Sequence, residues 1–184
     1  MIQKLIALFM LILLQPIFWL VSLIIIINDG FPIIYIQKKY GKNHKEFSFY
    51  KFRTMKNHSP EIPTEEFENA KNYILKSGKF LRKFSLDELP QLLNIIKGDM
   101  KFIGPRPSMI KNEEMVKKLR EEKGVDQLVP GITGWAQVNG RDLNSFEKKV
   151  ELDHYYMLNK SFLLDIKILI MTIKVVLLRT EIKH

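Results

Sequence analysis

Two adjacent carboxylates, Asp87 and Glu88, lie where the sequence predicts the start of a helix. Ser85-Leu86-Asp87-Glu88 matches a capping box, in which the serine caps the helix and the glutamate reaches back to it. That structural interpretation requires no catalysis. A helix N-terminus also attracts phosphate, and a carboxylate there stays ionised and can attack phosphorus when a cation screens the repulsion. The pair therefore predicts either a helix cap or a nucleophilic site.

Pro90 restricts where this helix can begin. In a helix that started at Ser85, the nitrogen of Pro90 would already have to donate to Leu86, and proline has no N–H to give. A start at Asp87 or later removes the conflict. In both cases the two carboxylates stay at the N-terminal end of the helix.

Several cations are available to pair with phosphate. They occur in Lys51-Phe52-Arg53, in Arg82-Lys83 and in Gly104-Pro105-Arg106-Pro107. The planar guanidinium of arginine suits phosphate oxygens, and a loop stiffened by two prolines loses little entropy when Arg106 is ordered. Most basic residues of a basic protein face solvent, so none of these motifs assigns a function alone.

Asp153 interrupts an apolar stripe. At helical spacing it shares one narrow face with Phe146, Val150 and Met157, whereas His154 lies off that face and is expected to be an ordinary surface residue. Two interpretations stay open for Asp153. It is either half of a buried ion pair with an arginine or lysine, or a group that positions substrate or metal.

The composition restricts the chemistry and the partners. The 184 residues suffice for one domain, and the absence of cysteine excludes disulfides, thiolate metal sites and a cysteine nucleophile. A formal net charge of +9 predicts an anionic partner, which the sign alone does not identify: nucleic acid, a phosphorylated small molecule or membrane head groups.

An uncharged run from Leu5 to Ile27 makes the membrane the leading partner. At about 1.5 Å per residue, a helix of this length matches the hydrocarbon core of a bilayer. Pro16 should bend the helix, so the chain either crosses the membrane or enters and leaves on one side. A cleaved signal peptide is a weaker alternative, because no small-residue cleavage site follows. The lysines and arginines after the run predict that the following domain is cytoplasmic.

Apolar spacing predicts the other elements. Short alternating runs predict strands or extended loops over 33–37 and 47–52, and helical spacing predicts helices over 66–76, 86–96 and 109–123. Glycines 78, 98 and 124 occur where these helices should stop. A turn-rich stretch over 129–144 predicts a structured loop or short hairpin, after which a helix resumes at Ser145. The apolar stretch over 162–178 carries charges that favour an interfacial helix over a second span.

Five motifs in order resemble the bacterial sugar transferases known as monotopic phosphoglycosyl transferases. They are Lys51-Phe52-Arg53-Thr54-Met55, Ser85-Leu86-Asp87-Glu88-Leu89-Pro90-Gln91-Leu92, Lys97-Gly98-Asp99-Met100, Gly104-Pro105-Arg106-Pro107, and the run from Pro130 to Arg141. The resemblance covers roughly residues 15 to 178.

The resemblance implies a fold and a location. It implies a mostly helical α+β protein, with a re-entrant, proline-kinked membrane helix over 1–28 and a cytosol-facing catalytic domain with interfacial amphipathic helices over 29–184. The expected location is the cytoplasmic membrane of a bacterium. The expected partners are a UDP-sugar, polyprenyl phosphate and a bilayer with anionic lipid, and nucleic acid is not among them.

The resemblance also implies roles for residues. Asp87 is the expected nucleophile, which attacks the sugar-linked phosphate, releases UMP and passes the phosphosugar to polyprenyl phosphate. Glu88 is the expected second member of the dyad. Magnesium is the implied metal, with Asp87 as its ligand. The expected substrate-binding residues are Lys51, Arg53, Arg106, Arg141 and Asp153.

Two other functions remain alternatives. One is a non-catalytic basic membrane adaptor, in which the dyad only caps a helix, and the other is an aspartyl-phosphate phosphatase that transfers to water. The sequence identifies neither the sugar nor the glycan pathway. It also leaves the oligomeric state open, a homodimer included.

Overall fold

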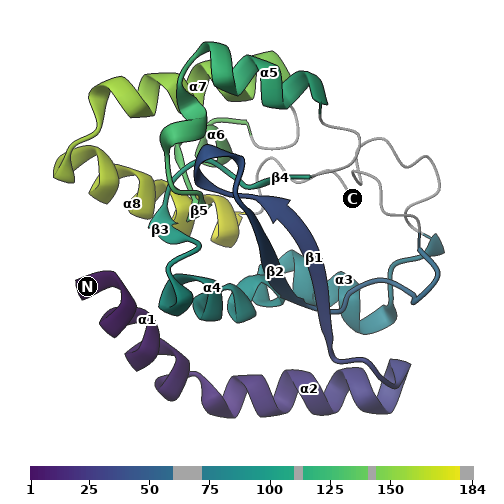
Figure 1. Ribbon diagram of the computed structural model, residues 1–184. Helices are drawn as coiled ribbons and strands as arrows, with labels where there is room; N and C mark the ends of the chain where they lie inside the picture. The colour runs from purple at the N-terminus through teal and green to yellow at the C-terminus, as the bar shows by residue number, and fades with distance from the viewer. Residues whose placement is uncertain (60–71, 110–113, 141–143, 179–184) are drawn as a thin grey trace. The chain divides into compact units, whose positions relative to one another are not determined.

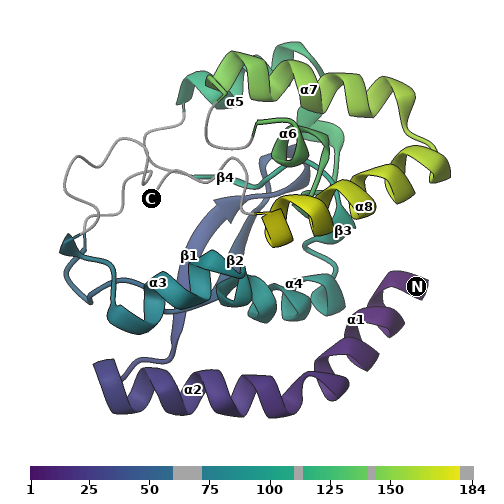
Figure 2. The same ribbon diagram turned by 180° about the vertical axis from the view of Figure 1, so that it is seen from behind.

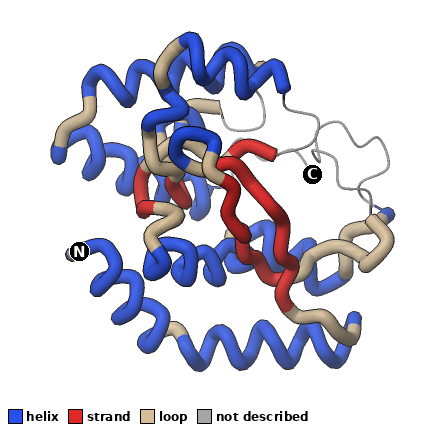
Figure 3. The backbone as a smooth tube through the Cα atoms, viewed as in Figure 1, coloured by secondary structure: helices blue, strands red, loops and turns tan. Residues whose placement is uncertain are grey.

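The computed structural model describes residues 1–59, 72–109, 114–140 and 144–178. Helices dominate it and the strands are short (Figure 3), which confirms the mostly helical α+β fold class. The chain packs as two compact units. The first unit comprises Met1–Gln37 and Phe49–Gly98, and the second unit comprises Lys38–Ser48 and Asp99–His184. These units do not test the expected division into a membrane helix over 1–28 and a catalytic domain over 29–184, which stays a prediction.

The described part of the first unit contains the helices α1 (Ile2–Leu13), α2 (Gln15–Asp29), α3 (Lys76–Lys83) and α4 (Leu92–Lys97) and the 3₁₀ turn η4 (Leu86–Gln91). Strands β1 (Ile34–Tyr40) and β2 (Glu46–Phe52) run from one unit into the other, and the two strand predictions are confirmed. One buried cluster of the first unit contains Val21, Ile25, Phe52 and Leu81, so α2 and α3 pack on the end of β2.

The N-terminal helix is broken where the proline predicted a bend. Helix α1 ends at Leu13, α2 begins at Gln15 and contains Pro16 in its first turn, and the two are bent by 60° (Figure 1). Pro16 has no N–H with which to continue the α1 hydrogen-bond ladder. In the described part of the chain, no single helix has the length and apolarity to cross a membrane, whereas the bent pair together meets both criteria.

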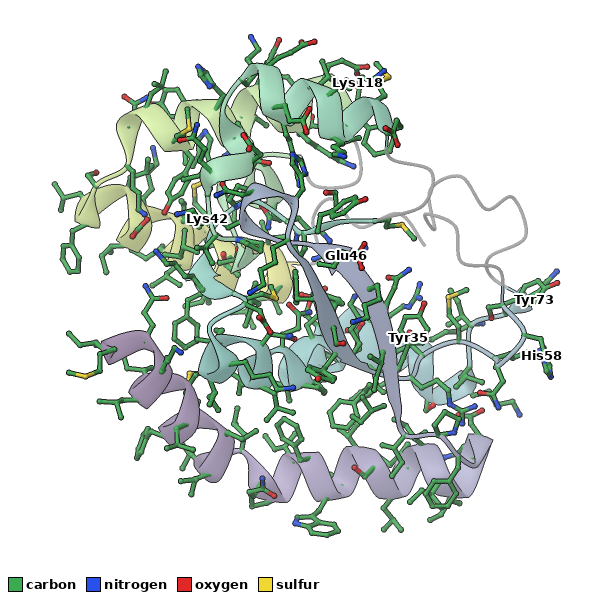
Figure 4. The ribbon with its side chains drawn as sticks, viewed as in Figure 1. Tyr35, Lys42, Glu46, His58, Tyr73 and Lys118 are labelled. Carbon is green, nitrogen blue, oxygen red and sulfur yellow. The ribbon has the colours of Figure 1, made fainter. Side chains whose placement is uncertain are left out.

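The bent pair is bonded to the rest of the first unit near both of its ends. Near the start of α1, the Lys4 ammonium donates to the carbonyl of Lys97 at the end of α4, at 3.3 Å. A cation there also complements the negative end of the α4 dipole. At the end of α2, the Ser77 hydroxyl donates to Asp29 Oδ2 at 2.6 Å. Figure 4 shows side chains that project outward along both helices, and most of the large apolar ones are exposed.

The described residues of the second unit form η1 (Lys42–His44), β3 (Lys101–Ile103), β4 (Ser108–Met109), α5 (Glu114–Glu122), η5 (Val125–Gln127), β5 (Gly131–Thr133), α6 (Trp135–Val138), α7 (Phe146–Asn159) and α8 (Phe162–Leu178). Strand β4 pairs antiparallel with the end of β1 in a sheet of order β2-β1-β4. Strand β3 pairs in parallel with β5. Helices α6, α7 and α8 meet at Val138, Tyr156 and Ile168 (Figure 2).

The helix predicted to resume at Ser145 is confirmed. Ser145 is the N-cap of α7, and its side chain accepts a hydrogen bond from the Lys148 amide at 3.3 Å. The C-terminal helix has the predicted bounds, although its interfacial position stays a prediction. Gly98 and Gly124 end helices in the left-handed conformation, as expected, with φ of 96° and 68°.

Several sequence predictions need correction. Gly78 does not stop a helix but lies inside α3, because a Cβ there would come within 2.2 Å of the Thr54 carbonyl oxygen and the close approach requires glycine. The stretch 129–144 forms no hairpin in its described part, since β5 pairs with the distant β3. The helix expected over 109–123 begins only at Glu114, with Met109 in β4. Residues 66–71 of the helix predicted over 66–76 lie outside the described residues, and its described part is not an α-helix, since Ile74 bridges to Met55 and α3 begins only at Lys76.

Candidate active site

The carboxylate pair lies on a 3₁₀ turn, and the predicted capping box does not form. Ser85 adopts a left-handed conformation, with φ of 53°, and its side chain makes no capping hydrogen bond. The physical reason is Pro90: a 3₁₀ turn over Leu86–Gln91 needs no bond from residue 90 to residue 86, whereas an α-helix starting here would. The interpretation of Ser85 and Glu88 as a capping box is therefore wrong.

Both carboxylates are largely buried next to one ammonium group. The side chains of Asp87 and Glu88 are 7% and 9% exposed. Lys51 Nζ donates to Glu88 Oε1 at 3.3 Å and lies 3.7 Å from Asp87 Oδ2. Two carboxylates at this depth need a compensating cation, because burial disfavours charge and like charges repel. The structure thus brings together three of the predicted site residues.

Tyr50 connects β2 to the helix that follows the dyad. Its backbone N–H donates to Asn94 Oδ1 at 3.2 Å, and its hydroxyl accepts from Lys97 Nζ at 2.5 Å. The Lys97 ammonium also lies 4.4 Å from the Tyr50 ring centre. Because Tyr50 is attached to α4 at two points, the next residue, Lys51, is held at a fixed position relative to the turn that carries the carboxylates. Sequence analysis did not identify Asn94 as a supporting residue, since its partner is distant in the chain.

Arg53 makes contacts that differ from those of Lys51. Its Nη2 donates to the carbonyls of Asp29 and Gly30 at 2.7 and 2.6 Å, and its Nη1 donates to Asn57 Oδ1 at 2.7 Å. These bonds satisfy carbonyls at the end of α2 that the helix itself cannot satisfy. The structure therefore gives Arg53 a role in holding the bent helix pair, and its predicted contact with substrate stays a prediction.

Asp153 forms a buried ion pair. Its Oδ2 lies 3.6 Å from Arg120 Nη2, and the Asp153 side chain is 3% exposed. Burial raises the pKa of Asp153 to about 7, while the guanidinium of Arg120 opposes that rise. The ion-pair interpretation thus has a named partner in Arg120, which no sequence pattern singled out. A role of Asp153 at a substrate stays a prediction.

A pH prediction follows from the buried Asp153. Its pKa is about 7 in the folded protein and near 3.8 without burial. Between these values the unfolded chain has lost the proton that the folded chain keeps, so raising the pH favours unfolding. Relative to Asp153→Asn, the wild type should lose stability as the pH rises from about 4 to about 7. Urea midpoints of both proteins measure this, and a constant difference across the interval would contradict it.

The remaining predicted positions fall elsewhere. Arg106 belongs to the second unit, between β3 and β4, and its carbonyl accepts a hydrogen bond from Arg120 Nη2 at 2.8 Å. Arg141 lies outside the described residues. His154 Nδ1 on α7 lies 2.9 Å from the carbonyl oxygen of Lys123, which follows α5, so this half-buried histidine makes a contact between segments that are distant in the chain.

The dyad supplies oxygen ligands of the kind that magnesium prefers. Among the described residues, no group of three or more acidic, histidine or cysteine side chains could hold a metal. Magnesium commonly uses one or two carboxylates and completes its shell with water and substrate phosphates. Asp87, with Glu88 beside it, fits that pattern, so the donor set is compatible with the implied metal.

Comparison with known proteins gives a consistent match. The model of a family described as bacterial sugar transferase matches residues 1–179. The uncharacterized sugar transferase EpsL of Bacillus subtilis is 41% identical over 84% of this chain and 75% of its own length. The UDP-glucose:undecaprenyl-phosphate glucose-1-phosphate transferase of Escherichia coli is 37% identical over 91% of this chain.

A third relative differs in the sugar that its name gives. The UDP-N-acetylgalactosamine-undecaprenyl-phosphate N-acetylgalactosaminephosphotransferase of Aeromonas hydrophila is 33% identical over 89% of this chain. The matches cover 37% of the length of the Escherichia coli protein and 40% of that of the Aeromonas protein. The chain therefore corresponds to only part of these two relatives.

Proposed function

Because the chain belongs to the bacterial sugar transferase family, we propose that it transfers a sugar 1-phosphate from a UDP-sugar to polyprenyl phosphate and releases UMP. The names of the Escherichia coli and Aeromonas relatives support the reaction class, since each gives an undecaprenyl-phosphate acceptor. The observation that carries the proposal is the buried pair of Asp87 and Glu88 beside the Lys51 ammonium.

The contacts of the pair favour Asp87 as the nucleophile. Lys51 Nζ is within hydrogen-bond distance of Glu88 Oε1, but it lies 3.7 Å from Asp87 Oδ2, which is an ion-pair distance. Glu88 thus anchors the cation, while an oxygen of Asp87 keeps lone pairs for attack. The ammonium also screens the repulsion between an attacking carboxylate and a diphosphate.

The proposed reaction has two displacement steps at one phosphorus. In the first, a carboxylate oxygen of Asp87 bonds to the sugar-linked phosphorus, and the bond from that phosphorus to the bridging oxygen breaks, so UMP leaves with the electron pair. In the second, a phosphate oxygen of polyprenyl phosphate bonds to the same phosphorus and the aspartyl oxygen leaves. The products are a polyprenyl diphosphate sugar and the regenerated carboxylate.

Other groups are proposed to bind the substrates. Arg106 binds phosphate oxygens through its planar guanidinium, and Arg141 matches a recurring polar position of the family. Magnesium, held by Asp87, would neutralise diphosphate charge when bound. Glu88 orients Lys51 and limits its movement.

The bent helix pair supports membrane attachment from one side. Both of its ends are fastened to the first unit, by Lys4 near the start of α1 and by Arg53 and Ser77 at the end of α2. A helix pair whose ends return to one folded unit is suited to a re-entrant arrangement rather than a crossing. In this arrangement, the large exposed apolar side chains of α1 and α2 would lie in lipid. Phe9 and Trp19, which are 66% and 73% exposed, are examples.

The second unit offers a surface for anionic lipid. Helix α8 exposes Phe162 and Leu163, at 78% and 79%, near its start. Burial, and then the nearby Lys160 and Lys42, lower the pKa of Lys101, which indicates a concentration of positive charge. Apolar side chains combined with such charge favour binding to the cytoplasmic face of a bacterial inner membrane.

The test uses the purified full chain with a panel of UDP-sugars, polyprenyl phosphate and magnesium. Release of UMP with formation of a lipid-linked sugar supports the proposal and identifies the sugar. With donor alone, mass spectrometry should find a phosphosugar on the peptide that contains Asp87. Salt-dependent vesicle binding without UMP release from any donor would support the adaptor instead, and release of free sugar phosphate without lipid product would support the phosphatase.

A further inference from the structure

The segment that carries Arg106 is held at the two residues before it. The Gly104 amide donates to the Thr133 carbonyl, and the Gly131 amide donates to the Pro105 carbonyl, each at 2.9 Å. The backbones approach so closely that a Cβ on Gly104 would lie 2.4 Å from the Val129 carbonyl oxygen. These contacts fix the segment on β5 up to Pro105.

Arg120 holds the next residue. Its Nη2 on α5 donates to the carbonyl of Arg106 at 2.8 Å. The same nitrogen lies 3.6 Å from Asp153 Oδ2 on α7, so one guanidinium group joins the Arg106 backbone to the buried carboxylate. The side chains of Arg120 and Asp153 are 12% and 3% exposed, so water solvates neither charge well and each depends on the other for stabilisation.

Packing brings the two helices together at this point. Val116 on α5 and Val150 on α7 share a buried cluster with Val125. Arg120 lies one helical turn after Val116, and Asp153 lies three residues after Val150, so both follow the cluster along their helices. Nε of Arg120 has no hydrogen-bond partner in the described part of the chain, so the orientation of the guanidinium depends on its Nη2 contacts.

We propose that Asp153 is a positioning residue, which orients Arg120 so that Arg120 holds the backbone of the phosphate-binding Arg106. The inference rests on the proposed function and deepens it. Asp153 then affects the reaction through Arg120 rather than by touching substrate. Without the carboxylate, a buried guanidinium loses its counter-charge and turns toward other acceptors or solvent, and the Arg106 carbonyl loses its donor.

A double-mutant cycle tests this order of contacts. The kcat/KM for UMP release is measured for Asp153→Asn, Arg120→Lys and Arg106→Ala, and for each of the first two combined with Arg106→Ala. Asp153→Asn and Arg120→Lys should each lose about tenfold alone, and Arg106→Ala about a hundredfold. In the Arg106→Ala background, neither of the other two should reduce the rate further.

The control is Glu151→Gln, on the same helix as Asp153. Glu151 is 58% exposed and pairs with Lys148 at 3.2 Å, so its loss should leave kcat/KM unchanged. If Asp153→Asn still lost about tenfold in the Arg106→Ala background, Asp153 would act on substrate directly and the proposal would be overturned. Should Asp153→Asn fail to fold, the cycle of Arg120→Lys with Arg106→Ala tests the contact through which Asp153 would act, and additive losses there would also overturn the proposal.

The cycle also separates this inference from the proposed function. If the wild type and Glu151→Gln release no UMP from any donor, the proposed function fails and this inference fails with it. If both are active and the losses are additive, only the positioning role is refuted.

Discussion

Asp87→Asn should abolish turnover, lowering UMP release by at least about a thousandfold, because an amide oxygen does not replace a carboxylate oxygen as a nucleophile. The substitution preserves the size of the side chain and removes one of the two negative charges near Lys51. The folded state should therefore persist while the chemistry is lost. UMP release and intact-protein mass after incubation with donor alone measure the two consequences.

Glu88→Gln is the matched control for this experiment. It removes the charge from the neighbouring carboxylate, the one within hydrogen-bond distance of Lys51, and leaves Asp87 in place. It should slow the reaction but still accumulate a phosphosugar on the enzyme. A full rate in Asp87→Asn, or an adduct on Glu88 in the wild type, would transfer the nucleophile's role away from Asp87.

Local patterns in the sequence predicted the elements that depend on local physics. The two strands, the cap of α7 at Ser145 and the bounds of α8 follow from side-chain periodicity and capping chemistry. The break near Pro16 follows from a missing N–H. Each of these features is determined by residues that are close together in the chain, so it can be recognised from the sequence alone.

The failures occurred where distant residues decide the conformation. Gly78 looked like a helix stop, but a strand-end carbonyl at Thr54 passes so close to α3 that only glycine fits. At the dyad, the sequence showed that Pro90 is incompatible with an α-helix starting at Ser85. It did not show that the chain would form a 3₁₀ turn there instead. The parallel pairing of β5 with β3 was likewise invisible in turn residues alone.

The candidate site shows the same division. The resemblance selected Asp87, Glu88 and Lys51, and the structure brings these three together. It could not identify Arg120, because the partner of Asp153 lies on another helix at no characteristic spacing. It also gave no sign that the guanidinium of Arg53 is engaged with carbonyls at the end of α2.

Replacing Lys51 by methionine should have the second largest effect. Methionine has a similar length but no charge, so two largely buried carboxylates would lose the ammonium that lies 3.3 Å from one and 3.7 Å from the other. A preorganised charge of this kind commonly contributes a factor of about 100 to 1,000 in rate.

Two variants distinguish the charge of Lys51 from its bulk and from general stability. Lys51→Arg keeps a cation and should retain more activity than Lys51→Met. Lys97→Met removes an ammonium of the same unit that contacts Tyr50 and, among the described residues, pairs with no carboxylate. Any loss it causes therefore reports on packing and on the attachment of Tyr50 that holds Lys51, and not on charge beside the carboxylates. Equal losses of UMP release in Lys51→Met and Lys97→Met would show that packing around β2 and α4, and not the charge of Lys51, limits the reaction. A selective loss in Lys51→Met would instead link this ammonium to the charge that develops during phosphoryl transfer.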